Sequence, residues 1–449
     1  MEPEADVKTD LSLLSEALDH GLMQKAEGLM ENLNPAEIAL LLESLPPAKR
    51  EIVWKLVDSS DEGEVLAELN DEVRTGLMEG MDLAALLAAT EGMALDDLAD
   101  VAADLPESIT QRLIQSLNAS DRERLEAVLS YPEDSAGGLM NPSTIAVRPN
   151  VSLEVVLRYL RALGELPDQT ASLFVVDRNG RYLGTLMISS LVTQDPGQSV
   201  IAVMDDEIEG IPASESAAEV AKQFQTRDLV TAPVVDDNGL LLGQITVDDV
   251  VDVIREQADH DILSMAGLDE EDDIFAPVAI SAGRRAIWLG VNLATAFLAA
   301  AVVGMFEATL AKVVTLAVLM PVVASMGGVA GSQTLTLMIR GIALGRIEDS
   351  NARWILFKEV AVGVLNGFGW AIVVMLITVT FFSDWDVGFV IGAAVAINLV
   401  VAALAGFLVP IILRRMNIDP ALAGGVVLTT VTDVVGFFSF LGLGTLFLT

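Results

Sequence analysis

The sequence predicts a multidomain protein with an all-α superhelical N-terminal domain, an α/β pair of repeated units and an α-helical transmembrane domain with five spans. Three observations predict this arrangement. The acidic excess lies in the first 283 residues, a β-rich segment repeats at a spacing of 59 residues, and five long apolar segments follow residue 284. The expected parts, in chain order, are the helical domain at 1–134, the two repeated units at 135–198 and 199–256, a connecting region at 257–283 and the transmembrane domain at 284–449. The acidic helix of the connecting region is expected to begin earlier, near residue 247.

Charge is distributed very unevenly along the 449 residues. Residues 284–449 contain nine Lys and Arg and eight Asp and Glu, a net of +1; the totals of 26 basic and 64 acidic residues then leave 17 and 56, a net of −39, in 1–283. So acidic a surface repels nucleic acid and anionic lipid and attracts cations. There is no Cys and there are only two His, which excludes disulfides, thiol catalysis and zinc–thiolate sites.

The region 10–130 has the pattern of short amphipathic helices separated by turns. A weak repeat at a spacing of 60 relates residues 33–46 to 93–106, and in each unit a Leu-Pro break separates two helices. Stacked helical repeats of this kind bury a common core. We interpret the acidic residues of this region as a solvated face, with a cation-sensing surface as the alternative; they are Glu62, Glu64, Asp71, Asp96, Asp97, Asp100 and Asp104.

A clearer repeat relates residues 173–192 to 232–251. In each copy a Val-rich strand reaches an Asp-x-Asn-Gly turn, returns as a second strand and enters a helix. Asn-Gly between two β-rich runs is a strong hairpin signal. With the helices expected at 153–163 and 217–225, the sequence predicts two β-α-β-β-α units, opened by Met140 and Met204.

Residues 247–273 are predicted to form an acidic helix that joins these units to the membrane domain. Its acidic residues and one His recur three or four positions apart, so most share one face, and unpaired like charges at that spacing destabilise a helix. A divalent cation would relieve the repulsion, and oxygen ligands suit Mg²⁺ or Ca²⁺. The alternative is an ordinary acidic linker. The residues are Asp249, Asp252, Glu256, Asp259 and His260.

Five apolar segments are long enough to cross a bilayer. With the N-terminus inside, eight of the nine basic residues of 284–449 are cytoplasmic and only Lys312 is outside. The positive-inside rule therefore predicts a multi-pass inner-membrane protein with a cytoplasmic N-terminal half and an external C-terminus. The first ten residues lack the basic and apolar regions of a signal peptide, in agreement. The predicted spans are 285–306, 312–339, 356–382, 387–413 and 422–448.

The fifth span carries an acidic residue, Asp433, near its middle. A carboxylate there is costly unless it faces water, a cation or a partner, so such residues usually mark an ion path. Gly425, Thr429, Asp433 and Gly436 are spaced to form one small, polar stripe. We interpret this stripe as the lining of a cation pathway; a structural carboxylate hydrogen-bonded between helices is the alternative.

The second span contains a glycine cluster between residues 320 and 336. Ala324, Gly328 and Ser332 form a small-xxx-small ridge for close helix approach. Gly327 and Gly331 are expected to expose backbone carbonyls beside a water-filled path, and Gln333 adds an amide. Helix packing alone is the alternative for this cluster.

The order of these parts resembles the MgtE family of magnesium channels. The residues that carry the resemblance are PEDSAGGLM (132–140), the Pro…Gly-Gly-x-x-Gly-x-Gln run (321–333), DPALAGG (419–425) and TTVTDVVGFFSFLGLG (429–444). The resemblance implies a homodimer whose second and fifth spans line a pore, with Asp433 holding a hydrated Mg²⁺. It also implies that cytosolic Mg²⁺ closes the pore by binding acids that match Asp228, Asp249, Asp252 and Asp261.

The repeated pair resembles tandem CBS domains, which bind adenine nucleotides or metals in a cleft. Thr246 and Asp249 match positions that hold a ribose in that family, whereas the first repeat has Ser189 and Ser190 where an acidic residue is common. ATP binding and a purely structural pair therefore both stay open.

Three positions depart from the MgtE pattern. Val329 stands where an Asn usually follows the glycine pair, and Gly424-Gly425-Val426 replaces polar residues before the filter. His260 replaces a Glu of the connecting helix, which suggests gating that depends on pH near 6–7. The first two changes remove polar groups beside the pore and bear on ion selectivity.

We therefore expect a Mg²⁺-selective channel or transporter gated by cytosolic Mg²⁺, a membrane-embedded homodimer that is not an enzyme and binds no nucleic acid. The first alternative is a channel or transporter for another divalent cation, such as Co²⁺, Mn²⁺ or Ca²⁺. A different class is a membrane-anchored CBS nucleotide sensor, which would need neither Asp433 nor the glycine cluster.

Overall fold

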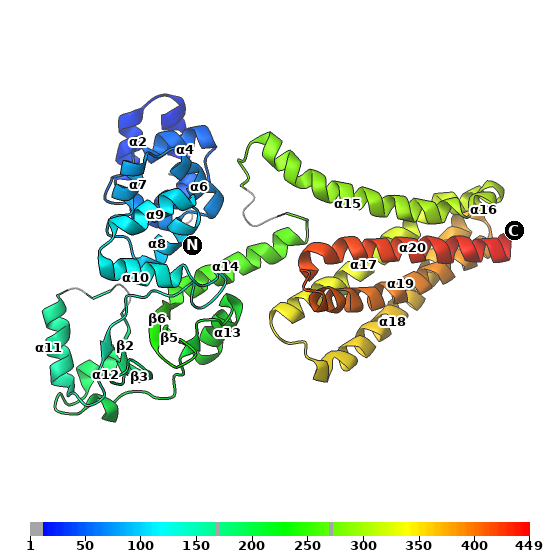
Figure 1. Cartoon of the computed structure of the whole chain (residues 1–449). Coiled ribbons are helices and arrows are strands. Elements are labelled where there is room, and N and C mark those ends of the chain that lie inside the picture. Colours follow the sequence, from blue (N-terminus) through cyan, green and yellow to red (C-terminus); the bar gives the residue numbers. More distant parts are fainter. Residues whose placement is uncertain (1–11, 165, 168–169, 269–272) are drawn as a thin grey trace. The chain divides into compact units, whose positions relative to one another are not determined.

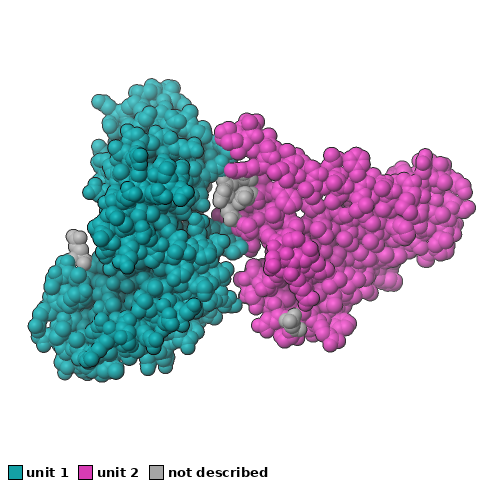
Figure 2. Space-filling model, in the orientation of Figure 1, with its two compact units in different colours: residues 1–258, 271–276 teal, residues 259–270, 277–449 magenta. Residues whose placement is uncertain are grey.

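The computed structural model describes residues 12–164, 166–167, 170–268 and 273–449. The chain divides into two compact units, coloured separately in Figure 2: unit 1 contains residues 1–258 and 271–276, and unit 2 contains residues 259–270 and 277–449. The division falls within one helix, α14 (Val247–Ser264), which therefore belongs to both units.

Unit 1 begins with the predicted all-α domain (Figure 1). Side chains cap several of its short helices. At the helix Pro35–Glu43, the Asn34 side chain accepts a hydrogen bond from the amide of Glu37, and the Asn34 amide donates one to the Glu37 carboxylate. Leu and Val side chains that recur at helical spacing form its core. The helices are α2 (Met23–Met30), α3 (Pro35–Glu43), α4 (Pro47–Trp54), α5 (Glu62–Glu68), α6 (Asp71–Glu79), α7 (Leu83–Ala89), α8 (Leu95–Ala103), α9 (Glu107–Ser116) and α10 (Ala119–Val128).

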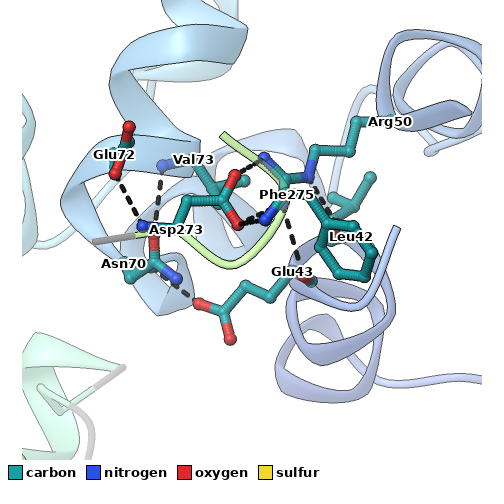
Figure 3. Close-up of polar contacts among 8 residues, drawn as sticks. All are labelled: Leu42, Glu43, Arg50, Asn70, Glu72, Val73, Asp273 and Phe275. Carbon is teal, nitrogen blue, oxygen red and sulfur yellow. Dashed lines mark hydrogen bonds and ion pairs between the residues drawn. The ribbon is translucent and has the colours of Figure 1, made fainter. Parts of the chain in front are cut away.

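The helical domain also binds the short segment that leads into the first membrane helix (Figure 3). The two terminal nitrogens of the Arg50 guanidinium, Nη1 and Nη2, donate hydrogen bonds to the carboxylate of Asp273, at 2.7 and 3.0 Å. Both side chains are buried. Glu72 accepts a hydrogen bond from the Asp273 amide, and the Arg50 guanidinium lies over the ring of Phe275. A paired and hydrogen-bonded buried charge of this kind ties residues far apart in the chain to one another.

The two repeated units form the predicted pair of small sheets. In each sheet the first strand is parallel to the second and the second is antiparallel to the third. Equivalent positions of the two repeats meet, since the hydroxyls of Ser172 and Thr231, 59 residues apart, lie 2.7 Å from each other. The elements are β1 (Ala146–Val147), α11 (Leu153–Leu163), β2 (Ser172–Val176), β3 (Tyr182–Met187), α12 (Ile188–Thr193), η1 (Val200–Ala202), β4 (Ile211–Pro212), α13 (Ala217–Arg227), β5 (Thr231–Val235) and β6 (Leu241–Thr246).

The Asp-x-Asn-Gly turns form as the sequence predicts. Asp177 accepts hydrogen bonds from the amides of Asn179 and Arg181, and Asp236 accepts them from Asn238 and Leu240. The glycine that follows has a positive φ in both turns, a conformation that a side chain would strain.

Unit 2 contains the five predicted spans, and its helices are long and apolar enough to cross a membrane. Helix α19 packs against α17, α18 and α20 and is the most buried of the five. Four helices begin before the predicted spans, by two residues for α19 and α20 and by seven for α15 and α18. The two larger differences arise because the helix continues through charged residues, Arg284 in α15 and Arg353 in α18, that hydropathy excludes. The elements are α15 (Val278–Gly304), α16 (Glu307–Lys312), α17 (Val314–Ala343), α18 (Asp349–Phe382), α19 (Trp385–Arg415) and α20 (Pro420–Leu448).

Candidate functional site

An open cavity of about 1010 Å³ lies along helices α17 and α20 of unit 2. Its wall combines small and apolar side chains with hydroxyl and amide groups and a single carboxylate, that of Asp433. A carboxylate in a membrane domain is tolerated only where it faces water, a cation or protein. The lining residues are Ala324, Ser325, Gly328, Val329, Ser332, Gln333, Thr336 and Leu337 of α17, with Thr429 and Asp433 of α20.

Two residues of the predicted polar stripe, Thr429 and Asp433, lie one turn apart on α20 and both line the cavity. The Thr429 hydroxyl donates to the carbonyl oxygen of Gly425 at 2.9 Å, so that donor is already used within the helix. The Asp433 side chain is half-buried. The groove therefore presents one carboxylate among neutral oxygen-bearing groups.

Three predicted glycines are placed in helix contacts away from this lining. A Cβ atom at Gly327 or Gly436 would meet the side chain of Asn398 on α19, and a Cβ at Gly331 would meet Leu428. These positions allow close helix approach, which was the alternative given for the cluster. Gly425 has open space around its Cα and is likewise not among the lining residues.

A second group of acidic residues gathers within unit 1, where α8 faces the first turns of α14. Burial, together with repulsion from Asp96, Asp100 and Asp249, raises the pKa of Asp97 to about 7. Burial also raises the pKa of Asp249 to about 7, although this carboxylate accepts hydrogen bonds from the amide and hydroxyl of Thr246. Carboxylates that repel one another in this way favour a bound cation.

The interpretation of the helical acids as a solvated face is wrong for Asp97 and Asp104, which are partly buried, whereas Asp71 is exposed. Asp71 and Asp104 form ion pairs with Arg74, at 2.6 and 2.7 Å, and Arg74 is itself buried. The sequence shows the three-residue spacing of Asp71 and Arg74 on α6, but it could not show the pairing of Asp104, which lies at the end of α8.

The remaining predicted regulatory residues do not form one cluster. Asp228 is exposed and ends α13 in a left-handed conformation, and Asp252 forms an exposed pair with Arg255. Among the described residues, no group of three or more His, Cys, Asp or Glu side chains is arranged to hold a metal ion. The others lie along α14, Glu256 in unit 1 and Asp259, His260 and Asp261 in unit 2.

His260 contacts the start of α20, one of the two helices that line the cavity, within unit 2. Its Nε2 atom lies 3.4 Å from a carboxylate oxygen of Asp419, which caps α20 by accepting hydrogen bonds from the amides of Ala421 and Leu422. The same imidazole nitrogen is 3.4 Å from the Ser264 hydroxyl. His260, which stands where the MgtE pattern has a Glu, therefore lies next to α20, the helix that carries Asp433.

Two buried polar residues of the membrane domain were not singled out from the sequence. Glu359 on α18 is paired with Lys358 at 2.7 Å and accepts a hydrogen bond from Thr334 on α17. Asn398 on α19 is buried and donates to the carbonyl oxygen of Val323. A search for every polar residue inside an apolar span would have found both.

Comparison with known proteins agrees with this architecture. Models for a divalent cation transporter domain (MgtE), for the MgtE intracellular N domain and for CBS domains match residues 320–443, 33–134, and 136–196 with 200–256. The magnesium transporter MgtE of Thermus thermophilus is 31% identical over 442 residues, which cover 97% of this chain and 98% of that protein. The chain belongs to the MgtE family.

Other MgtE proteins match over similar lengths. The magnesium transporter MgtE of Bacillus subtilis is 25% identical over 431 residues, 96% of each chain. A crystal structure of the cytosolic domain of the Mg²⁺ channel MgtE in complex with ATP is 32% identical, covers 54% of this chain and 99% of that one, and has a TM-score of 0.49. MgtE proteins are membrane transporters, and the five apolar helices of this chain agree with that class.

Proposed function

We propose that this MgtE-family chain conducts Mg²⁺ across the inner membrane through the cavity that Asp433 lines. The observation that carries the proposal is the position of this carboxylate, half-buried on the wall of an open groove of the membrane domain whose lining also holds hydroxyl and amide groups. The relatives named as magnesium transporters support Mg²⁺ as the ion. Since Mg²⁺ sheds its water reluctantly, a wide groove with one carboxylate suits the hydrated ion.

The conducting form in this proposal is a homodimer. All lining residues of the cavity come from α17 and α20, and the Val329 side chain on its wall is 59% exposed. A second copy that applied the same two helices would enclose the groove and place two Asp433 carboxylates around one ion, the arrangement expected of a symmetric dimer.

Gating by cytosolic Mg²⁺ follows from the acidic residues of unit 1. Mg²⁺ bound beside Asp97 and Asp249 would offset their mutual repulsion and hold α8 against α14. Because α14 continues to residue 264, a change in its first turns acts on the chain that leads to the membrane helices. An ion that binds the closed arrangement more tightly shifts the population toward it. ATP bound at Thr246 and Asp249 is a second ligand in this proposal. It is less favoured than Mg²⁺ because the Asp249 carboxylate already accepts a hydrogen bond from the Thr246 hydroxyl.

The test of the pathway is Mg²⁺ flux into proteoliposomes by wild type and Asp433→Asn, with Co²⁺ and Ca²⁺ as competitors. We expect the variant to lose at least about 90% of the flux, because the ion loses the charge that offsets its partial dehydration. Flux that survives the substitution would place the pathway elsewhere.

Transport of another divalent cation is the second candidate. The apolar Val329 on the cavity wall favours it, because a polar side chain is absent where the family pattern has one. Competition experiments decide between the two candidates. If Co²⁺ or Mn²⁺ suppresses Mg²⁺ flux at a far lower concentration than the Mg²⁺ concentration needed to suppress Co²⁺ or Mn²⁺ flux, then that other ion is the substrate.

A further inference from the structure

Asn398 is a buried polar side chain at the centre of the membrane domain. It belongs to α19 and has no exposed surface. Its Nδ2 atom donates to the carbonyl oxygen of Val323 at 2.9 Å, and its Oδ1 atom is buried without a hydrogen-bond partner among the described residues. An unsatisfied amide oxygen is costly there, so packing alone does not explain why this position is polar.

The carboxamide occupies the space left by two glycines on two other helices. At Gly327 of α17, the three atoms that a Cβ would meet all belong to the Asn398 side chain. At Gly436 of α20, a Cβ would lie 2.7 Å from Asn398 Nδ2. One amide group therefore separates α19 from the backbones of both helices that line the cavity.

The residues that contact Asn398 lie directly behind the cavity wall. Val323 and Gly327 precede the lining residues Ala324 and Gly328, and Gly436 lies about one turn after Asp433. A shift of either backbone at these contacts moves the lining residues with it, because the helices are rigid over one turn.

We propose that Asn398 is a positioning residue of the ion pathway, whose amide sets the separation of α17 and α20 at Asp433 and thereby the preference between Mg²⁺ and the larger Ca²⁺. This inference rests on the proposed function. The hydrogen bond to Val323 fixes α17, and contact with Gly436 limits the approach of α20.

The first test measures the ratio of Mg²⁺ to Ca²⁺ flux in Asn398→Ala, at matched protein levels in proteoliposomes. We expect this ratio to fall about tenfold, because displacements well below 1 Å alter how a site fits its ligand. A residue that only supports the fold would lower both fluxes together, so an unchanged ratio overturns the proposal.

The second test is a double-mutant cycle with Gly327→Ala, read by Mg²⁺ flux and by thermal unfolding of the purified protein. In the wild-type background the new methyl group overlaps the carboxamide, and we expect at least about a tenfold loss of flux from overpacking. In the Asn398→Ala background the obstacle is gone, and the same change should cost less than about threefold. Equal losses in the two backgrounds contradict the contact.

Gly442→Ala is the matched control, since a Cβ at this α20 position meets nothing within 4 Å, and it should have no effect in either background. Asn398→Ser, a smaller change, replaces Asn398→Ala if the latter does not reach the membrane. Asp433→Asn distinguishes failure of the proposed ion pathway from failure of the proposed role of Asn398. If Asp433→Asn is inactive but Asn398→Ala and Gly327→Ala show no coupling in the double-mutant cycle, only the role of Asn398 is overturned. Full activity of Asp433→Asn overturns the pathway, whereas the unfolding cycle still reports the helix contact.

Discussion

Val329 is the residue at which the cavity of the proposed ion pathway differs most plainly from the family pattern. It lies on the cavity wall beside Gly328, and its side chain is 59% exposed. An apolar side chain cannot accept a hydrogen bond from the water shell of a passing ion. In the proposed pathway, selectivity would then depend more on Asp433 and on the hydroxyl and amide groups of α17.

Val329→Asn should therefore raise the preference for Mg²⁺ over Ca²⁺ and Co²⁺ by roughly three- to tenfold, the value of about one added hydrogen bond. Competitive flux measurements give this ratio directly. Val329→Ala widens the groove without adding a polar group and should leave the ratio nearly unchanged. An equal gain in both variants would show that width, not polarity, is what position 329 controls.

The contact between α8 and α14 makes the stability of unit 1 depend on pH. The pKa of Asp97 and that of Asp249 are about 7 in the folded chain, above the ordinary value of 3.8 for an Asp. A raised folded-state pKa means that the unfolded chain ionises first, so the stability present below pH 4 is lost as pH rises through 7.

We expect the free energy of unfolding, measured in a chelator, to fall by roughly 1–3 kcal/mol between pH 5 and pH 8, after allowance for solvent screening. Mg²⁺ should reduce this fall because it binds the charged form. Thermal unfolding at several pH values with and without Mg²⁺ tests this, and Asp97→Asn should flatten the profile. A stability that rises over this pH range would contradict the assignment.

The segment that carries Asp273 depends on one buried ion pair for its contact with α4. Removal of one partner leaves a buried charge, so Asp273→Ala should cost about 3–5 kcal/mol locally. Hydrogen exchange of α4 measures this opening. The exposed Glu154–Arg158 pair is the control, and Glu154→Ala should cost less than about 1 kcal/mol. Similar exchange in both variants would mean that the Arg50 contact is weak.

At the scale of the whole molecule, a half with a net charge of −39 is joined to a nearly neutral membrane half. Self-repulsion of this charge favours separation of the acidic elements when no divalent cation is bound. Because α14 begins in unit 1 and ends in unit 2, the two halves share one continuous helix.

Asn substitutions at Asp249, Asp252 and Asp261 together should leave the channel open at high cytosolic Mg²⁺, because the proposed regulatory ion loses the Asp249 carboxylate and α14 loses two further negative charges. When flux is measured at increasing internal Mg²⁺, the concentration that gives half-maximal closure should rise by at least about tenfold. Gln substitutions at the exposed Glu123, Glu126 and Glu154 change the net charge equally and are the control. Closure at the wild-type concentration in the Asp triple variant would count against this gating model.

Local pattern was enough for most of the fold. Apolar length determined the five spans, and the repeated Asp-x-Asn-Gly turns determined both hairpins, because these features depend on residues close in the chain. The start of α18 at residue 349, ahead of its predicted span, was missed because a helix continues through polar residues that hydropathy excludes.

The candidate site divides in the same way. The sequence alone determined that Asp433 and Thr429 share one face of a membrane helix, since helical periodicity settles it. Only the tertiary structure decided that Gly327 and Gly436 face Asn398, that Asp104 pairs with Arg74, and that the half-buried Asp97 lies near Asp249. Those outcomes depend on which helices pack together, and contacts between residues far apart in the chain leave no periodic trace in the sequence.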